Sequence, residues 1–379
     1  MASPERAGRF VTQPEGFRAF VPTPLPPDPD LTLESDLVAE LSAADTALGR
    51  LDGVVGVVPD PDLFVAMYVR REAVLSSQIE GTQSSLQDLL DLEIGESRGV
   101  KADVSEIVNY VAAMNHGLER LADLPLSGRL IREVHERLLD GVRGSGATPG
   151  EFRRSQNWIG PEGTTLEDAV FVPPPVAEMR TAVSDLEKFM HERDLRPNLI
   201  DVGLVHAQFE TIHPFLDGNG RVGRLLITLM LVERGILSRP LLYLSHFFKR
   251  HRAEYYDRLM AVRLSGDWEG WMRFFLRGVA ETASEATENA RRIFELREQH
   301  RALLLDEGLS QHGLPILSAL YDLPMINVNR ASELLDVSFP TANRVIGEME
   351  KLGLLVEISG RRRSRVFRYE PYVALFGAD

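Results

Sequence analysis

The residues best suited to chemistry in this chain lie together in one short segment, His213–Arg224, which reads HPFLDGNGRVGR. The imidazole of His213 has an ordinary pKa near ~6.5, so it can act as a general base at neutral pH. The carboxylate of Asp217 could hold a Mg²⁺ ion that bridges phosphate oxygens. Together these groups suit the in-line attack of a hydroxyl on the phosphorus of a nucleotide.

The rest of the segment predicts an anion-binding turn. Gly218 and Gly220 allow the backbone to approach a phosphate closely, and the amide of Asn219 can donate a hydrogen bond to it. Arg221 and Arg224 are three residues apart, so they share one face of a helix. Cations in the first turn of a helix are unfavourable because they oppose its dipole, at a cost of roughly a few tenths of a kcal/mol each. A polyanion bound between the two arginines would offset this cost.

Two predicted helices position this segment. Residues 204–212 carry apolar side chains at helical spacing, and Pro214 ends that helix. Residues 225–232 predict a buried helix that ends at Gly235. Because the first N–H groups of a helix have no partner within it, the start of the second helix is suited to binding an anion in the loop.

The same residues allow three other interpretations. Residues 218–223 match the dinucleotide-binding pattern G-x-G-x-x-G, but that pattern requires a preceding strand and here a helix is expected. A zinc site could form from His206, Glu210, His213 and Asp217, although histidines on one helix face are more often packed in the core. A plain polar turn would not require this combination of glycines, arginines, histidine and aspartate.

The segment resembles the signature of Fic-domain proteins, HPFx(D/E)GNGRxxR, and fits it at every fixed position. This resemblance implies transfer of AMP from ATP to a Ser, Thr or Tyr hydroxyl of a protein, with Mg²⁺ and release of pyrophosphate. By position it implies that His213 deprotonates the target and that Asp217 binds the metal. It also implies that ATP is bound by Asn219 with the Gly218–Gly220 backbone at the α-phosphate, by Arg221 at the β-phosphate and by Arg224 at the γ-phosphate.

A second motif, SSQIEG at residues 76–81, lies far upstream. Asp60 and Pro61 predict a helix start and Gly81 predicts its end, so that Glu80 is the last helical residue. The helix dipole disfavours a carboxylate at that position, which suggests that Glu80 has a remote partner.

These residues resemble the inhibitory motif of Fic proteins, (S/T)xxxE(G/N), with Ser76 and Glu80 at its fixed positions. The resemblance implies that Glu80 forms an ion pair with Arg224. A bidentate pair of this kind would occupy the γ-phosphate position and deny ATP its productive pose. The alternative is an exposed glutamate at a helix end with no such role.

Two further features concern the target and the nucleotide base. The extended runs at 151–160 and 169–175 surround a turn and predict a β-hairpin. In Fic proteins a hairpin flap in this region pairs with the target as an added strand, and a structural loop is the alternative. Tyr255 and Tyr256 lie on a predicted helix and could stack on adenine, although aromatic helix faces usually belong to the core.

The last part of the chain predicts a winged helix-turn-helix. The expected order is a helix beginning near Pro315, helices at 329–335 and 341–352, and strands at 354–359 and 365–369. An arginine-rich tip between the strands is suited to phosphates. The candidate DNA contacts are Arg344, Arg361, Arg362 and Arg363. The alternative is a module that contacts only protein.

Composition limits the remaining possibilities. With a formal net charge of −14 over 379 residues, the whole chain is not an electrostatic nucleic-acid binder, so any DNA contact must be local. The absence of cysteine excludes disulfides, thiolate zinc sites and cysteine catalysis. The N-terminus lacks a signal-peptide core, and no apolar run approaches ~18 residues, so we expect a cytoplasmic protein without membrane contact.

We therefore predict a mainly α-helical protein, with a Fic-type helical core, a β-hairpin flap and a small C-terminal winged helix-turn-helix domain. The proline-rich residues 1–30 are expected to form an extended lead-in. The expected parts are an N-terminal region at 1–100, with the inhibitory helix at about 61–80, and a Fic catalytic core at 101–280. A connecting helix is expected at 281–310, where the charged run 280–305 lies, and the winged domain at 311–379.

The functional hypothesis is an autoinhibited protein adenylyltransferase that uses ATP and Mg²⁺. One alternative is a DNA-binding regulator whose Fic core senses nucleotide or modifies the regulator itself. Another is an enzyme of the same fold that removes AMP, in which Glu80 orients the attacking water. The sequence leaves open the target protein, which could be the chain itself, the choice of nucleotide donor, and whether a homodimer forms.

Overall fold

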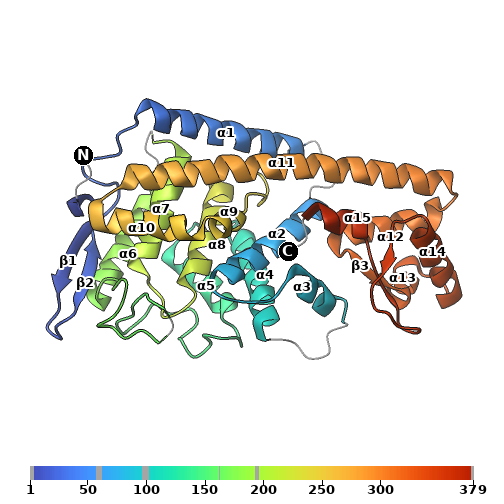
Figure 1. Cartoon of the computed structure of the whole chain (residues 1–379), viewed down its shortest axis with the longest axis horizontal. Helices are drawn as coiled ribbons and strands as arrows, with labels where there is room; N and C mark the ends of the chain where they lie inside the picture. Colours follow the sequence, from blue (N-terminus) through green and yellow to red (C-terminus); the bar gives the residue numbers. More distant parts are fainter. Residues whose placement is uncertain (1–3, 57–61, 96–101, 162, 193–195, 377–379) are drawn as a thin grey trace.

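The computed structural model describes residues 4–56, 62–95, 102–161, 163–192 and 196–376. Most of this part of the chain is helical, and two small sheets lie at its opposite ends (Figure 1). None of the helices described is long and apolar enough to cross a membrane.

Two consecutive helices form the centre of the molecule. In α7 (Asn198–Ile212) every residue from Leu199 onward is buried, and α8 (Asn219–Glu233) is buried over most of its length. A helix that is apolar on all sides is stable only when other elements surround it. The elements packed around this pair include α4 (Ala102–Arg120), α5 (Gly128–Leu138), α6 (Val176–His191) and α10 (Arg252–Ser265).

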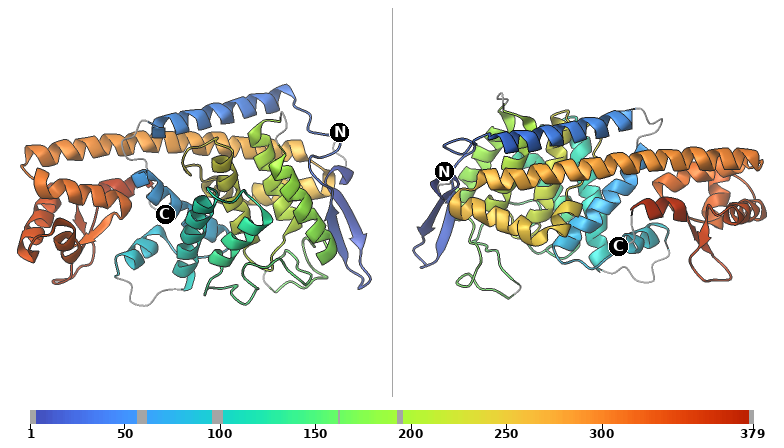
Figure 2. Two further views of the ribbon diagram at one scale, coloured as in Figure 1. Left: turned by 180° about the vertical axis from the view of Figure 1, so that it is seen from behind. Right: turned by 45° about the horizontal axis from the view of Figure 1, so that its top comes forward.

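A single helix of 39 residues, α11 (Trp268–Asp306), runs along the length of the molecule, with α1 (Ser35–Gly56) packed against it (Figures 1 and 2). The connecting helix expected at 281–310 is the second half of this helix, which begins already at Trp268 and is not a separate element. Gly278 does not break the helix because it serves packing: a Cβ there would lie 2.7 Å from the ring of Phe247.

The helix that carries the upstream motif is α2 (Asp62–Ile79). It ends one residue earlier than expected, so Glu80 lies in the following turn, which Gly81 continues with φ +96°. The predicted helix start at Asp60 and Pro61 lies outside the described residues. After the turn comes α3 (Leu86–Glu93), which was not expected and begins with a capping box between Ser85 and Asp88.

The C-terminal part has the predicted order of helices and strands, with a short strand added before the second helix and two short helical segments added after the last strand. The strand β3 (Met325–Asn327) is only three residues long, too short to show a periodic pattern in the sequence. It joins a three-stranded antiparallel sheet in the order β3-β5-β4. The other elements are α12 (Ser310–Asp322), α13 (Val328–Leu335), α14 (Phe339–Lys351), β4 (Val356–Glu357), β5 (Val366–Arg368), α15 (Glu370–Val373) and the 3₁₀ helix η2 (Ala374–Phe376).

The N-terminal residues are more ordered than an extended lead-in. After the 3₁₀ helix η1 (Pro4–Arg6), strands β1 (Gly8–Thr12) and β2 (Arg18–Pro22) form an antiparallel hairpin. Phe10 and Phe20 pair across it with ring centroids 5.1 Å apart, and this cross-strand contact stabilises the hairpin. The prolines that follow concealed these strands in the sequence.

The predicted flap hairpin is only partly present. In the described part of residues 151–175, one antiparallel bridge joins Ile159 and Phe171, and no ladder of paired strands extends from it. Pro161 and the prolines at 173–175 cannot donate to a ladder. Side chains before the bridge instead hold the loop that follows α7.

Candidate active site

The loop after α7 begins with an unusual backbone conformation. His213 has φ +49° and ψ +61°, the left-handed region that non-glycine residues rarely adopt, and its N–H donates to the carbonyl of Phe209 at 2.9 Å. Strain of this kind persists only where surrounding contacts over-determine it, and it is concentrated at functional sites.

Those contacts come from three side chains outside the loop. Asn157 Nδ2 donates to the carbonyls of His213 at 3.1 Å and Phe215 at 2.8 Å. The buried Arg153 donates through Nε to the same His213 carbonyl at 3.1 Å. His135 Nε2 donates to the carbonyl of Asp217 at 3.1 Å, and its ring stacks on Phe215. The position of the catalytic candidate is therefore fixed by residues up to 78 positions earlier in the chain.

Asn219 closes the loop from inside. Its Oδ1 accepts from the N–H of Phe215, and its Nδ2 donates to the carbonyl of Phe215, both at 2.9 Å. The side chain is buried. Both polar atoms of this amide thus bond the loop backbone and hold the loop, while the predicted contact of Asn219 with the α-phosphate stays a prediction.

We predict that Asn219→Ala lowers the free energy of unfolding by about 1–3 kcal/mol, because the buried N–H of Phe215 loses its partner, while the Phe215 carbonyl keeps its hydrogen bond from Asn157. Asn219→Asp keeps the acceptor and removes the donor, so its loss should be intermediate. Urea denaturation of the purified variants measures both. An Asn219→Ala protein as stable as the wild type would contradict the role in the loop.

The first turn of α8 has space for a carboxylate next to its backbone, and Glu80 occupies that space. Gly218 starts the helix with φ +77°, and a Cβ on Gly220 would overlap the Oε1 atom of Glu80. The glycine thus allows an anionic group to approach the unpaired N–H groups of this turn, which are the preferred partners of phosphate oxygens.

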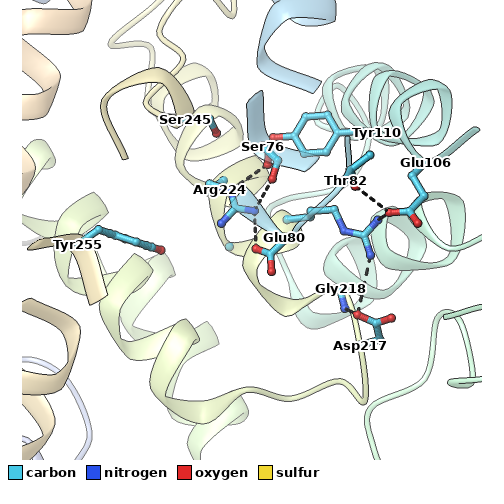
Figure 3. Close-up of polar contacts among 12 residues, drawn as sticks. Ser76, Glu80, Thr82, Glu106, Tyr110, Asp217, Gly218, Arg224, Ser245 and Tyr255 are labelled. Carbon is cyan, nitrogen blue, oxygen red and sulfur yellow. Dashed lines mark hydrogen bonds and ion pairs between the residues drawn. The ribbon is translucent and has the colours of Figure 1, made fainter. Parts of the chain in front are cut away.

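Glu80 also meets the second arginine of the segment (Figure 3). Arg224 Nη2 lies 2.7 Å from Glu80 Oε1, and the arginine donates further to Ser76 Oγ at 2.8 Å and to the Ser76 carbonyl at 3.0 Å. The pKa of Glu80 is lowered: burial raises it, and the opposing effect of the Arg224 charge and hydrogen bond is larger. The structure thus brings together the two motifs that the sequence places 144 residues apart.

The first arginine is held by a different carboxylate. Arg221 Nη1 lies 3.0 Å from Oε2 of Glu106 on α4, and both side chains are buried. Arg221 Nη2 lies 3.8 Å from Asp217 Oδ1. Sequence reasoning missed Glu106, since one glutamate in an amphipathic helix has the pattern of a surface residue.

Burial sets the protonation state of the base. Burial, together with the nearby charge of Arg263, lowers the pKa of His213 to about 3, so the imidazole is neutral at physiological pH. Burial likewise raises the pKa of Glu210 to about 7. A neutral imidazole in a site with two arginines can accept a proton while the arginines hold anionic groups.

Asp217 has the properties of a magnesium ligand. Its side chain is 43% exposed, and Oδ1 accepts from the N–H of Gly218 at 2.6 Å, which directs the carboxylate toward the start of α8. Mg²⁺ is usually bound by one or two carboxylates together with phosphate oxygens and water, so one half-exposed carboxylate fits. The described residues contain no group of three or more metal-ligating side chains.

His206 has no role in metal binding. Its Nδ1 donates to the carbonyl of Gly223 at 3.0 Å, and its Nε2 therefore accepts from the Tyr255 hydroxyl at 2.9 Å. Because both ring nitrogens are used, the zinc interpretation is wrong for this residue.

Tyr255 is buried among Phe248 and Trp271, so its predicted contact with adenine is also wrong. The apolar helix face belongs to the core, which was the alternative. Tyr256, with 40% of its surface exposed, remains available for such a contact.

Comparison with known proteins agrees with this geometry. Residues 38–119 match the Fic/DOC family N-terminal region, and residues 125–231 match the Fic/DOC family. The chain belongs to the Fic family. The Fic match contains the whole His213–Arg224 segment, and the N-terminal match contains Glu80 and Glu106.

Related sequences are named as protein adenylyltransferases. The protein adenylyltransferase Fic of Aedes aegypti is 28% identical over 269 residues, which are 68% of this chain and 49% of that protein. A probable protein adenylyltransferase of Aquifex aeolicus is 29% identical over 181 residues, 46% of this chain and 51% of that protein. The chain thus spans about half the length of these curated relatives.

Solved structures show the same fold. A Fic family protein from Desulfovibrio desulfuricans superposes with a TM-score of 0.57 at 19% identity and covers 89% of this chain and 97% of its own. A Fic domain containing signaling protein from Bacteroides thetaiotaomicron gives a TM-score of 0.53 at 18% identity, covering 65% of this chain and 95% of its own. The predicted mainly α-helical, Fic-type fold is confirmed.

Proposed function

We propose that this protein is an autoinhibited protein adenylyltransferase, which transfers AMP from ATP to a hydroxyl of a protein. The observation that carries the proposal is the Glu80–Arg224 ion pair over the first turn of α8, beside a neutral His213. A carboxylate that fills an anion site next to a general base is the arrangement expected of a phosphate-transfer site that is blocked. The names of the related proteins, protein adenylyltransferases, support the same reaction.

In the proposed reaction, His213 accepts the proton of the target hydroxyl. The hydroxyl oxygen attacks the α-phosphorus while the bond from that phosphorus to the bridging oxygen of the β-phosphate breaks, and pyrophosphate leaves. The N–H groups at the start of α8 bind the α-phosphate, and Arg221 and Arg224 bind the β- and γ-phosphates. A Mg²⁺ ion held by Asp217 would neutralise part of the phosphate charge.

Autoinhibition follows from the contacts of Arg224. While Glu80 bonds Nη2, that donor is not available to a γ-phosphate, and the carboxylate itself repels the phosphate. Release requires the turn after α2 to move Glu80 away. Ser76 keeps Arg224 in place through two further hydrogen bonds, so the arginine remains in position for ATP.

The loop around the Ile159–Phe171 bridge is suited to binding the target. Trp158 and Val170 flank the bridge and are 43% and 59% exposed, which is unusual for side chains of this size. A target segment could add to this edge as an extended strand, with its hydroxyl directed toward His213.

The decisive test uses ATP labelled at two different phosphates. Incubated with Mg²⁺ and candidate targets, a transferase of this kind leaves the α-label on protein and releases the γ-label in pyrophosphate. A kinase would give the reverse pattern. Because the wild type is inhibited by Glu80, the assay uses the Glu80→Gly protein, in which a regulator that only senses nucleotide, or an enzyme that only removes AMP, would label nothing.

A second function, binding of duplex DNA, is favoured by one groove between the C-terminal part and the residues after α3, where Ile94 and Gly95 line it. This groove has a volume of about 840 Å³. Its basic lining residues are Arg362, Arg363 and Arg365 from the β4–β5 loop, and α14 contributes Phe339 and Asn343. Residues 311–379 contain eight basic and eight acidic side chains, whereas the whole chain carries −14, so the chain's excess of acidic residues lies elsewhere.

The predicted DNA contacts differ in how well they fit this groove. Arg362 and Arg363 line it, and both are exposed, as is Arg344 on α14. Arg361 is only partly exposed and is not among the residues lining it. We therefore propose that phosphate contacts come mainly from Arg362 and Arg363.

We predict that replacing Arg362 and Arg363 with alanine weakens binding of a fluorescent duplex and lowers its salt dependence. The slope of log K against log salt concentration should fall by about 1 for each phosphate that the variant no longer binds. Lys351→Ala, an exposed cation at the far end of α14, is the matched control and should change neither quantity. Equal salt slopes for the wild type and the double variant would exclude this groove as the DNA site.

A further inference from the structure

The two signature arginines are each held by a carboxylate from the N-terminal half of the chain. Glu80 holds Arg224, and Glu106 holds Arg221 from a position 115 residues earlier. The two carboxylates are not equivalent: the Glu80 side chain is 31% exposed, whereas that of Glu106 is 2% exposed. An anionic ligand that arrives from solvent can therefore displace Glu80 from Arg224, but it cannot reach the buried Glu106 in the same way.

Glu106 is also fixed by more partners. Arg143 Nε lies 3.2 Å from Glu106 Oε1, and the hydroxyl of Thr82 donates to Oε2 at 3.5 Å (Figure 3). With Arg221 Nη1 at 3.0 Å, three groups from three parts of the chain meet this carboxylate. Burying a carboxylate is costly unless it is paired and hydrogen-bonded, and here both conditions are met, so the Glu106–Arg221 contact is a permanent part of the site.

The pairing leaves one edge of the Arg221 guanidinium without a hydrogen bond. Nη1 bonds Glu106, while Nε is buried without a hydrogen-bond partner and Nη2 has only the 3.8 Å ion pair with Asp217. Nε and Nη2 form one side of the planar fork, which matches two oxygens of a phosphate. A buried donor without a partner costs about 1–3 kcal/mol, and a phosphate oxygen would remove that cost.

We infer that Glu106 is a positioning residue, which holds Arg221 so that its free Nε–Nη2 edge receives the β-phosphate of the nucleotide. The inference rests on the proposed function and adds to it a residue outside both sequence motifs. It also assigns opposite roles to the two carboxylates, since Glu80 must leave its arginine for ATP to bind, whereas Glu106 must stay.

The test is equilibrium binding of ADP and AMP, measured by titration calorimetry with the full chain carrying Glu80→Gly. Only ADP has a β-phosphate. Glu106→Gln should weaken ADP binding by about tenfold or more, because a buried, unpaired guanidinium no longer has a fixed orientation. The affinity for AMP should change by less than about twofold, since Arg221 does not contact the α-phosphate.

A matched control is Glu133→Gln. Glu133 also pairs with an arginine of α4, Arg120 at 2.9 Å, and its other ion-pair partners, His116 and Arg129, lie outside the signature, so neither nucleotide should bind differently. In addition, Glu106→Gln combined with Arg221→Ala should bind ADP no more weakly than Arg221→Ala alone, because Glu106 acts through that arginine. This cycle remains informative even if Glu106→Gln lowers stability.

Three results would overturn the inference. An unchanged affinity for ADP would show that Arg221 needs no such partner, and an increased affinity would make Glu106 a competitor of the phosphate. An equal loss for ADP and AMP would indicate a general structural effect. If the Glu80→Gly protein itself bound neither nucleotide, the proposed function would fail together with this role, whereas binding without any transfer activity would leave the role of Glu106 testable.

Discussion

Replacing Glu80 with glycine is expected to raise the rate of AMP transfer by about tenfold or more. The substitution removes the carboxylate from the first turn of α8 and frees Nη2 of Arg224 for a γ-phosphate. Arg224 keeps its two hydrogen bonds to Ser76, so the arginine should remain in place although its buried charge loses a partner. The measurement is the initial rate of label transfer from α-labelled ATP.

The matched control for this variant is Glu93→Gly. Glu93 is also a glutamate at the end of a helix and also pairs with an arginine, Arg70, at 2.8 Å, yet it has no contact with the signature segment. Its substitution should leave the transfer rate near that of the wild type. A Glu80→Gly protein that transfers AMP no faster than the wild type would rule out this ion pair as the brake.

Sequence reasoning was most successful where the functional groups are close together in the chain. His213, Asp217 and both arginines lie within twelve residues, so one loop and the helix after it had to bring them together. Glu80 was found from its position at a helix end and from a short motif that resembles one associated with the signature. The structure places it against Arg224, a contact that spacing alone could not have indicated.

The supporting residues could not be found in that way. Glu106, Arg153 and Asn157 act on the signature from 56 to 115 residues away, and each has an ordinary local pattern. Their importance arises from burial and from the tertiary packing that brings them together. Asn219 was found, but the sequence could not show that its amide also bonds the backbone of Phe215.

Replacing His213 should abolish most of the transfer activity. In the Glu80→Gly background, loss of a general base typically lowers the rate by about 10²–10⁴-fold. Asparagine is the better replacement, because it tolerates the left-handed backbone at this position more readily than alanine does, so the loop stays in place. Initial rates and melting temperatures of His213→Asn should then show a large loss of activity with little loss of stability. A residual rate above about a tenth of the parent would exclude His213 as the base.

The pH dependence of the parent Glu80→Gly protein tests the same residue without replacing it. Because burial lowers the pKa of His213 to about 3, the imidazole stays deprotonated as the pH falls from 7.5 to 5.5. A histidine with the ordinary value near ~6.5 would lose about tenfold of its basic form over that interval. The charge of Glu80 raises the pKa of His213, so its removal lowers that pKa further.

The quantity to follow is kcat/KM for ATP, since this parameter reports the groups of the free enzyme, before the nucleotide brings its own negative charge. We expect it to fall by much less than tenfold between pH 7.5 and 5.5, with the remaining variation coming from Glu210, whose pKa is raised to about 7. A fall of about tenfold with a midpoint near ~6.5 would mean that His213 is exposed to water once Glu80 is gone. In that case the Glu80 turn would not only block the γ-phosphate position but would also shield the catalytic base from solvent.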